Sequence, residues 1–258
     1  MDEQDVSLCN KKCKTTFSGE QWLMICFLIS KGEHDNEKPE RTFKTHDGGS
    51  VWTYASALPY DWRERGVTTS FLGHTTHNSG KAAWGDAYPL FHKFHKMGGP
   101  DLAPEARTCN ESKKKADAFA TRIQTLDARD AERYATAGIK VMVSKKNYLR
   151  KSIQALRDLG IEPRALSVAT VWDTAMNQGI GGKWCPVAWL STHGVKGDED
   201  ETMKQFNHWR RDAAQKNHHN SPPSNGAARS DMFESLRRDG RWDLPRKACE
   251  EAVGWRMR

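Results

Sequence analysis

The chain has 258 residues, of which 37% are hydrophobic and 28% charged, and its formal net charge is +7. This composition predicts a globular core under a very polar surface and excludes a disordered chain. The length suits one large domain, or two lobes that share a cleft. The longest apolar run, WLMICFLI at 22–29, is too short to span a membrane and indicates a buried helix segment.

The positive charge is spread along the chain in short runs such as Lys113–Lys115. A net charge of this sign often accompanies nucleic-acid binding, but scattered cations are typical of a solvated surface. We therefore expect neither a nucleic-acid nor a membrane partner. The opening residues, MDEQDVSLCNKKCKTTF, lack the apolar segment of a secretion signal, so no signal peptide is expected and the compartment stays open.

The first part of the chain changes character twice. Residues 1–17 predict a flexible arm, and Ser18 with Gln21 fits a capping box that begins a helix over 18–31. After this helix we expect a charged loop and then short strands with turns: 33–47 and 51–73.

The remainder of the chain is predicted to be helical from its apolar periodicity. The expected helices are Lys81–Lys96, Ser112–Ala137, Lys145–Leu159, Arg164–Gln178, Glu199–Lys216, Ala227–Arg238 and one that opens at Pro245. The segment 164–178 is apolar enough to predict a central buried helix. Together these elements predict an α+β fold that is mainly α, with a small sheet region. We expect one domain of two lobes over 18–258, the minor lobe covering about 34–100.

The sequence gives little support for a metal site formed by histidines or cysteines. Two histidine pairs have ligand-like spacing, His74 with His77 and His92 with His95, but no Glu completes an HExxH motif. The six cysteines are scattered, and no second pair completes a zinc set. Buried free thiols are the simpler interpretation, and one or two disulfides are the alternative. We expect no metal and no organic cofactor.

The densest set of chemically capable residues begins at the end of the first apolar helix. Glu33 follows that helix, and further polar residues lie in the strand region and at the helix start beyond it: Asp61, Glu64, Arg65, Thr68, Thr69 and Asp86. Hydrolysis of a glycosidic bond needs one carboxylic acid to protonate the leaving oxygen and a second carboxylate to activate water or attack the sugar. Trp62 lies among these residues, and indole faces stack on sugars, although core packing is the commoner use of tryptophan. Read alone, the same carboxylates also fit a solvated surface.

Three segments of the C-terminal half resemble chitosanases of glycoside hydrolase family 46. They are ALSVATVWDTAMNQG at 165–179, GDEDETMKQFNHWRR at 197–211 and GAARSDMFESLRRDGRWDLP at 226–245. The first resembles the central helix of the family, and the last is similar to its closing helix, which contains an arginine. The resemblance implies that Asp173 and Arg210 belong to a charged network behind the active site, with Glu199 near it.

The N-terminal half adds three more segments in the order that the family has them. FLISKGE at 27–33 resembles the helix that ends in the general acid, RGVTTSFLG at 65–73 resembles an arginine–glycine segment, and WGDAYPLF at 84–91 resembles a glycine–aspartate helix start. The resemblance implies that Glu33 is the proton donor and that Thr68 helps to hold the attacking water. It further implies that Arg65 lines the sugar site and that Asp86 binds an amino sugar.

The chain departs from the family pattern at three places. The family has its catalytic base two residues before the arginine, where this chain has Arg63, so Asp61 is our preferred base and Glu64 the alternative. The loop between Glu33 and Arg65 is longer than in typical members. An arginine expected before residue 197 is absent, and His193 or Lys196 stands nearest.

The resemblance implies a lysozyme-like, two-lobed enzyme that hydrolyses β-1,4-linked glucosamine polymer within the chain by inversion. A polysaccharide substrate and a monomeric protein are therefore expected. Two alternatives stay open: a hydrolase of peptidoglycan or chitin with the same fold, and a non-catalytic protein that binds amino sugars.

Overall fold

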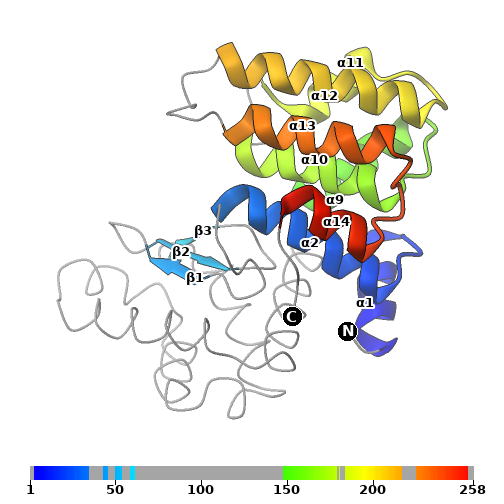
Figure 1. Cartoon of the computed structure of the whole chain (residues 1–258). Helices are drawn as coiled ribbons and strands as arrows, with labels where there is room; N and C mark the ends of the chain where they lie inside the picture. Colours follow the sequence, from blue (N-terminus) through cyan, green and yellow to red (C-terminus); the bar gives the residue numbers. More distant parts are fainter. Residues whose placement is uncertain are drawn as a thin grey trace, which may run out of the picture.

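The computed structural model describes residues 3–34, 43–45, 50–53, 59–61, 148–178, 180, 184–216 and 225–254. In this part the chain is mainly helical, and its helices form one packed body (Figure 1). The predicted mainly α class is confirmed. The division into two lobes and the extent of the small sheet region stay predictions, because most of residues 35–147 lie outside the described residues.

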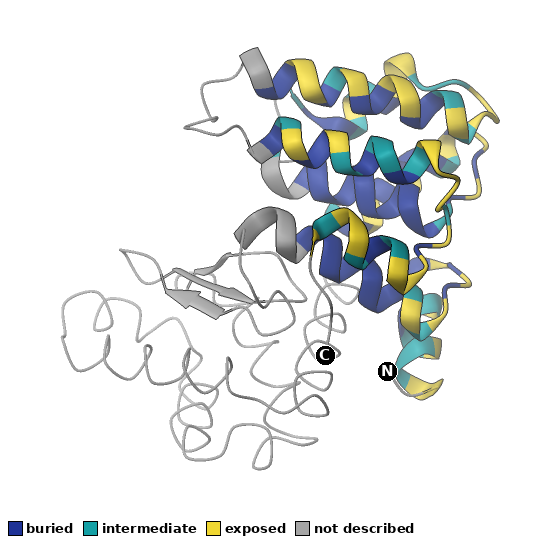
Figure 2. Cartoon of the chain, viewed as in Figure 1, coloured by how far each residue is buried: buried dark blue, intermediate teal, exposed yellow. Residues whose placement is uncertain are grey.

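Helix α10 (Ala165–Gln178) lies at the centre of this body, as its sequence predicts. Each of its residues from 165 to 175 is buried, and Trp172 is among the largest buried side chains. Five helices pack around it: α2 (Gly19–His34), α9 (Tyr148–Asp158), α11 (Pro186–His193), α12 (Glu199–Lys216) and α13 (Asn225–Arg238). Figure 2 shows α10 as an almost continuous buried ribbon among helices with exposed outer faces.

Helix α2 begins as the capping box predicts. The Ser18 hydroxyl accepts a hydrogen bond from the Gln21 amide at 3.1 Å, and the Gln21 side chain accepts one from the Ser18 amide at 2.8 Å. The apolar run 22–29 that follows is buried at every position. The helix continues to His34, three residues beyond the predicted end, so Glu33 lies within its last turn and not in a loop.

The expected flexible arm over residues 1–17 is wrong. Residues 3–13 form helix α1 (Glu3–Cys13), with Cys9 and Cys13 buried. The carboxamide oxygen of Asn10 accepts hydrogen bonds from the Thr15 hydroxyl at 2.9 Å, the Phe17 amide at 3.1 Å and the Trp22 indole at 3.1 Å. This one side chain ties the segment to α2, a long-range use of asparagine that no local pattern reveals.

Helix α11 is a second element that the sequence did not predict. It is short, and its polar start is formed by Cys185, whose sulfur accepts from the Ala188 amide at 3.4 Å and contacts the Ile180 carbonyl at 3.1 Å. Thiols are uncommon caps, so the usual Ser, Thr, Asp or Asn signal is missing. The helix ends at Gly194, where a Cβ would lie 2.2 Å from Leu159 Cδ1.

Helices α12 and α13 run antiparallel, and polar pairs mark their alignment. Asp200 pairs with Arg237 near one end, and Arg211 pairs with Asp231 near the other. Helix α14 (Arg246–Val253) then returns to α2 through the ion pair between Arg246 and Glu20 at 2.6 Å. Its start at Pro245 agrees with the prediction.

Three short strands form an antiparallel sheet in the order β1 (Phe43–Thr45), β2 (Ser50–Thr53) and β3 (Pro59–Asp61). β2 pairs with both neighbours, Lys44 opposite Trp52 and Ser50 opposite Asp61. β1 falls in the segment 33–47, which was predicted as loop. β3 lies within the segment 51–73, which was predicted as strands, and β2 begins one residue before it. Within the described residues, no helix has both the length and the apolar character that crossing a membrane requires.

Candidate functional site

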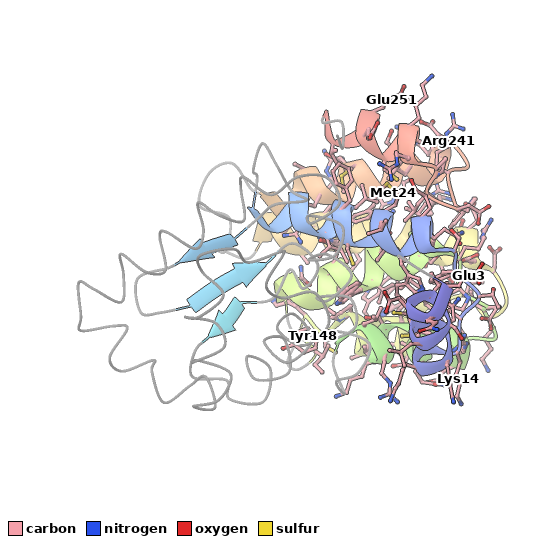
Figure 3. The ribbon with its side chains drawn as sticks, turned by 90° about the horizontal axis from the view of Figure 1, so that it is seen from below. Glu3, Lys14, Met24, Tyr148, Arg241 and Glu251 are labelled. Carbon is pink, nitrogen blue, oxygen red and sulfur yellow. The ribbon has the colours of Figure 1, made fainter. Side chains whose placement is uncertain are left out.

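The two carboxylates at the centre of the sequence hypothesis lie on elements that meet. Glu33 belongs to the last turn of α2, and Asp61 is the last residue of β3. Figures 1 and 3 both show the C-terminal end of α2 beside the three strands. The backbone therefore brings the two segments to one region, while both side chains lie outside the described residues.

The other residues assigned to the catalytic and sugar-binding site lie outside the described residues. They are Trp62, Glu64, Arg65, Thr68 and Asp86. The two histidine pairs that were considered as metal ligands, at 74/77 and 92/95, also lie outside the described residues. Their roles stay predictions. In the described part, no group of three or more His, Cys, Asp or Glu side chains has an arrangement that could hold a metal ion.

A buried charged network lies in the helical body behind these segments. Asp173, on α10, accepts hydrogen bonds from Arg210 of α12 and from Arg229 of α13, and Arg229 Nε lies 3.1 Å from Asp173 Oδ2. The exposed fractions of the side chains of Asp173 and Arg210 are both 0%, and that of Arg229 is 3%. Three helices thus meet on one carboxylate.

This network is electrostatically demanding. Each ion loses hydration on burial, at an effective cost of several kcal/mol, which the ion pairs and hydrogen bonds must offset. Both guanidinium groups contact this one carboxylate. The Arg210 guanidinium also lies 5.5 Å from the centre of the Phe233 ring, where the ring face attracts a cation. A network of this kind fixes the relative positions of α10, α12 and α13.

Asp173 and Arg210 are two of the residues that the resemblance assigned to a supporting network, and they contact each other directly. Arg229 is a third member, which sequence reasoning did not single out. The sequence feature that could have indicated Arg229 is an arginine among small residues, GAARS at 226–230, on the buried face of a helix. Small neighbours allow the backbone of α13 to approach α10 closely enough for the guanidinium to reach Asp173.

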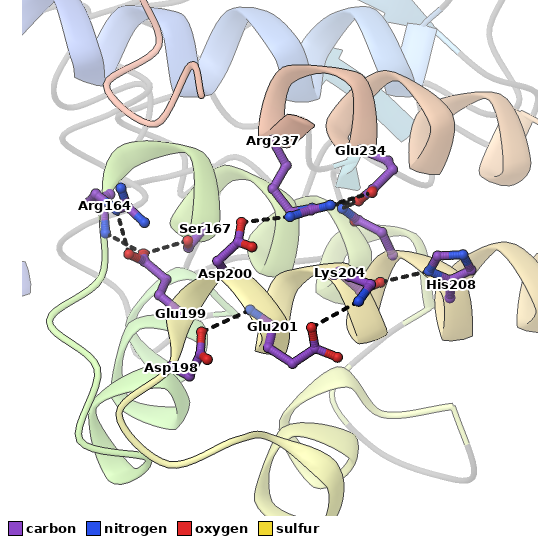
Figure 4. A network of polar contacts seen from close by, with 11 residues as sticks. Arg164, Ser167, Asp198, Glu199, Asp200, Glu201, Lys204, His208, Glu234 and Arg237 are labelled. Atoms are coloured by element: carbon purple, nitrogen blue, oxygen red, sulfur yellow. Dashed lines mark hydrogen bonds and ion pairs between the residues drawn. The ribbon is translucent and has the colours of Figure 1, made fainter. Parts of the chain in front are cut away.

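Glu199 belongs to a different cluster, at the beginning of α10. Its carboxylate accepts hydrogen bonds from the Arg164 amide at 2.9 Å, from Arg164 Nε at 2.5 Å and from the Ser167 hydroxyl at 2.5 Å (Figure 4). The Arg164 guanidinium in turn lies 3.6 Å from the centre of the Trp242 ring. Glu199 therefore satisfies the first turn of α10 and stabilises its positive end. The resemblance implied a position for Glu199 near the Asp173 network, whereas these hydrogen bonds connect Glu199 to the beginning of α10.

A third polar cluster connects α12 to α13 on the outer side. Partial burial raises the pKa of Glu234, but hydrogen bonds from Arg237 and Asn207 outweigh it and leave the pKa of this carboxyl below its ordinary value. Arg237 bridges Glu234 at 2.8 Å and Asp200 at 2.6 Å, as Figure 4 shows. This cluster joins two helices and needs no catalytic explanation.

His193 and Lys196, the two residues nearest to the place of the missing arginine, are both exposed and do not contact the Asp173 network. His193 is exposed and its ring stacks on Trp189 with 5.2 Å between centres. Trp189 also stacks on Trp209 at 5.4 Å, so His193 ends an aromatic cluster. Lys196 is exposed on the following turn.

Comparisons with known proteins agree with this architecture. The chain is 26% identical to a chitosanase of Niallia circulans over 268 residues, which cover 95% of this chain and 80% of the relative. The fold is similar to that of a family 46 chitosanase of Gynuella sunshinyii in complex with chitotetraose, with a TM-score of 0.51 and 13% identity over 89% of this chain and 93% of the other. No protein-family model matches the chain. The resemblance to family 46 chitosanases that the sequence segments indicate is therefore confirmed, in sequence and in fold.

Proposed function

We propose that this chain is a glycoside hydrolase that degrades chitosan, a polymer of β-1,4-linked glucosamine. The observation that carries the proposal is the similarity to the Niallia circulans chitosanase along 95% of the chain. The similar fold of the Gynuella sunshinyii enzyme, whose complex holds chitotetraose, supports the same substrate class. Cleavage within the polymer and inversion at the anomeric carbon are finer parts of the proposal.

Glu33 is the proposed general acid. It lies in the last turn of a helix whose preceding two turns are buried, at the end of the helix that meets the sheet. A carboxyl next to an apolar helix end loses hydration, and desolvation favours its protonated form. In that form Glu33 would donate its proton to the glycosidic oxygen as the bond to the anomeric carbon breaks.

Asp61, at the end of β3, is the proposed general base, with Glu64 as the alternative. The base would remove a proton from a water held with Thr68, and that water would attack the anomeric carbon from the face opposite the leaving group. Inversion requires the two carboxyl groups to stand roughly 6.5–9.5 Å apart so that the water fits between them. Arg65, Asp86 and Trp62 would bind the sugar rings on either side.

The Asp173 network is proposed to support the acid from behind. Arg210 and Arg229 join α12 and α13 to α10, which packs directly against α2, the helix that carries Glu33. A rigid contact between these helices would keep the general acid in place.

The proposed function is tested with Glu33→Gln, assayed for the release of reducing ends from soluble chitosan. The amide keeps the shape of the side chain but cannot donate the proton, so turnover should fall by about 10²–10⁴-fold while the circular dichroism spectrum is retained. Unchanged turnover would refute the assignment. Parallel assays on chitin and on bacterial cell walls separate chitosan from the alternative substrates. Binding of glucosamine oligomers without cleavage at any pH would indicate a non-catalytic binding protein.

A further inference from the structure

A row of aromatic side chains extends from α11 to α12 at the surface of the helical body. The rings follow one another in the order Trp184, Trp209, Trp189 and His193, with 6.5, 5.4 and 5.2 Å between successive centres. The three tryptophans are partly exposed and His193 is exposed, so the row reaches the solvent. We call these four residues the aromatic row.

The rings of the aromatic row are displaced sideways from one another. Aromatic rings in direct face-to-face contact lie about 3.5–4.0 Å apart. The planes of successive rings are inclined by only 35°, 25° and 18° while their centres are at least 5.2 Å apart, so each ring covers only part of the next. Trp189 also makes a T-shaped contact with the buried Phe206, at 5.3 Å between centres, which holds the row on the core. The row is therefore a fixed platform of partly uncovered rings.

Polar side chains of α12 border the aromatic row. Residues three and four apart lie on the same face of a helix, so Gln205 and Asp212 lie beside Trp209. Gln205 donates a hydrogen bond to Glu201 at 3.0 Å, which extends this polar border by one turn. Asp212 is exposed and makes no ion pair within the described residues. An amide and a free carboxylate thus stand next to the rings.

The cations of α12 lie away from the aromatic row. Lys204 and Arg211 stand five residues before and two residues after Trp209, positions that a helix of about 3.6 residues per turn puts on its opposite side. Both are paired with carboxylates. Helix α11 contains no lysine or arginine, and Lys196 follows only beyond its end. In a chain with a net charge of +7, the charge beside Trp209 is therefore the negative charge of Asp212.

We propose that the aromatic row and Asp212 form a surface site that binds chains of glucosamine. The apolar faces of pyranose rings pack on aromatic rings, and an ammonium group is attracted both to an indole face and to a carboxylate. A glucosamine unit has an apolar ring face and an ammonium group, so it fits both parts of the site. A polyanion would instead be repelled by Asp212. The choice of glucosamine over neutral sugars rests on the proposed function together with this carboxylate.

The aromatic row is separate from the proposed catalytic site. Helix α11 packs on α9, α10 and α12, while α2, whose last turn contains Glu33, packs on α10 and α14. Figure 1 shows α11 and α12 at the top of the helical body and the strands beside the end of α2 below them. A surface site at this place would keep the enzyme on its polymer while the catalytic site releases one product and binds the next segment.

The test measures adsorption of the full chain to insoluble chitosan during a short incubation in the cold, before hydrolysis is appreciable. Trp209→Ala removes a central ring of the row, and Asp212→Lys reverses the charge beside it. The matched control Trp242→Ala removes another partly exposed tryptophan, whose ring lies 3.6 Å from the Arg164 guanidinium. Asp239→Lys, at an exposed acid just after α13, gives the same net charge as Asp212→Lys. Circular dichroism and urea unfolding establish that each variant is folded.

Trp209→Ala should adsorb at least about tenfold more weakly than the parent, as expected for a central aromatic contact. Asp212→Lys should weaken adsorption about threefold or more at low salt and less at high salt, and it tests the site even if Trp209→Ala does not fold. Both controls should adsorb like the parent. Equal losses in a variant and its control, or unchanged adsorption of Asp212→Lys, would overturn the proposal.

Two further measurements test the choice of ligand. The parent should adsorb more weakly to chitin, whose acetylated sugars carry no ammonium group, and equal adsorption to chitin and chitosan would overturn the preference for glucosamine. Analytical ultracentrifugation of the parent should show a monomer. A dimer that Trp209→Ala dissociates would mean that a second copy of the chain covers the row, and would also overturn the proposal.

Hydrolysis of a soluble glucosamine hexamer and of insoluble chitosan is measured on the same proteins. Trp209→Ala should cleave the hexamer at the parent's rate and the insoluble polymer more slowly, whereas an equal fall on both substrates would indicate a merely structural effect and overturn the surface site. A parent that adsorbs through the row but cleaves neither substrate would refute the proposed function and leave the surface site supported. A parent that cleaves both, with adsorption unchanged in Trp209→Ala, would refute only the surface site.

Discussion

Arg210 donates a hydrogen bond to Asp173 across the interface of α12 and α10, at a place where neither side chain is exposed to solvent. Their positions are 37 residues apart in sequence, and Arg229 joins them from a third helix. A carboxylate that holds three helices together should dominate the stability of the helical body.

Asp173→Asn tests this dependence. The amide keeps the volume but removes the charge, so two buried guanidinium groups lose the carboxylate that both of them contact. Breaking a buried ion pair in this way costs about 3–5 kcal/mol. Urea unfolding should show a loss of this size in the free energy of unfolding.

The matched control is Asp231→Asn, which breaks the exposed pair with Arg211 at 3.4 Å, where both side chains are about half exposed. Exposed pairs contribute about 0–1 kcal/mol, so this variant should remain close to the parent. Similar losses in both variants would contradict the central role given to Asp173.

Asn10→Ala tests whether α1 is an integral part of the fold. The substitution removes the acceptor of the Thr15 hydroxyl, the Phe17 amide and the Trp22 indole, and Trp22 is completely buried. A buried donor left without a partner costs about 1–3 kcal/mol, so the free energy of unfolding should fall by at least that amount. Gln4→Ala, on the exposed side of the same helix, is the control and should leave the unfolding free energy unchanged within error. An unchanged free energy of unfolding in Asn10→Ala would favour the original prediction of a flexible arm over residues 1–17.

The buried thiols predict a loss of stability at alkaline pH. Burial raises the pKa of Cys13 to about 12, against the opposing charges of Arg150 and Arg157, and burial also raises the pKa of Cys249 to about 12. Because the pKa is higher in the folded than in the unfolded state, the stabilisation is complete below the ordinary value of 9.0 and is lost as pH rises from there towards 12.

Urea unfolding measured between pH 8 and about pH 11 checks this prediction. The parent should lose stability as the pH rises, and Cys13→Ala with Cys249→Ala should lose less over the same interval. At pH 8 iodoacetamide should label none of the five described cysteines in the folded protein, since all are buried. Parallel pH profiles of the parent and the double variant would show that the thiols do not contribute.

The sequence predicts the helical body well where the signal is local. The Ser18–Gln21 capping box and the largely apolar segment 164–178 each depend on neighbours within a few residues, and both predictions are confirmed. α1 was missed because its stability comes from Asn10, whose partners lie up to 12 residues away. α11 was missed because its cap is a cysteine.

For the site, family resemblance led to Asp173 and Arg210, whereas periodicity alone indicates only a buried helix. Arg229 and the position of Glu199 required three-dimensional packing, because both depend on how α10, α12 and α13 approach one another. The acid and base stay predictions from sequence segments. Their identification rests on chemistry that can be measured directly.

The last prediction concerns the identity of the catalytic base, because this chain has Arg63 where the family has its base and Asp61 lies two residues earlier. If Asp61 is the base, Asp61→Asn should reduce turnover on chitosan by about 10²–10⁴-fold, while Glu64→Gln should have a much smaller effect. Both variants should bind glucosamine oligomers, since an amide still forms hydrogen bonds. The reverse order of effects would assign the base to Glu64.

Product stereochemistry, followed by proton NMR during hydrolysis, is the independent check: an activated water attacks from the opposite face, so the α-anomer should form first. A β-anomer formed first would mean that the second carboxylate attacks the sugar itself, and the two carboxyl groups would then have to stand closer, at roughly 5–5.5 Å.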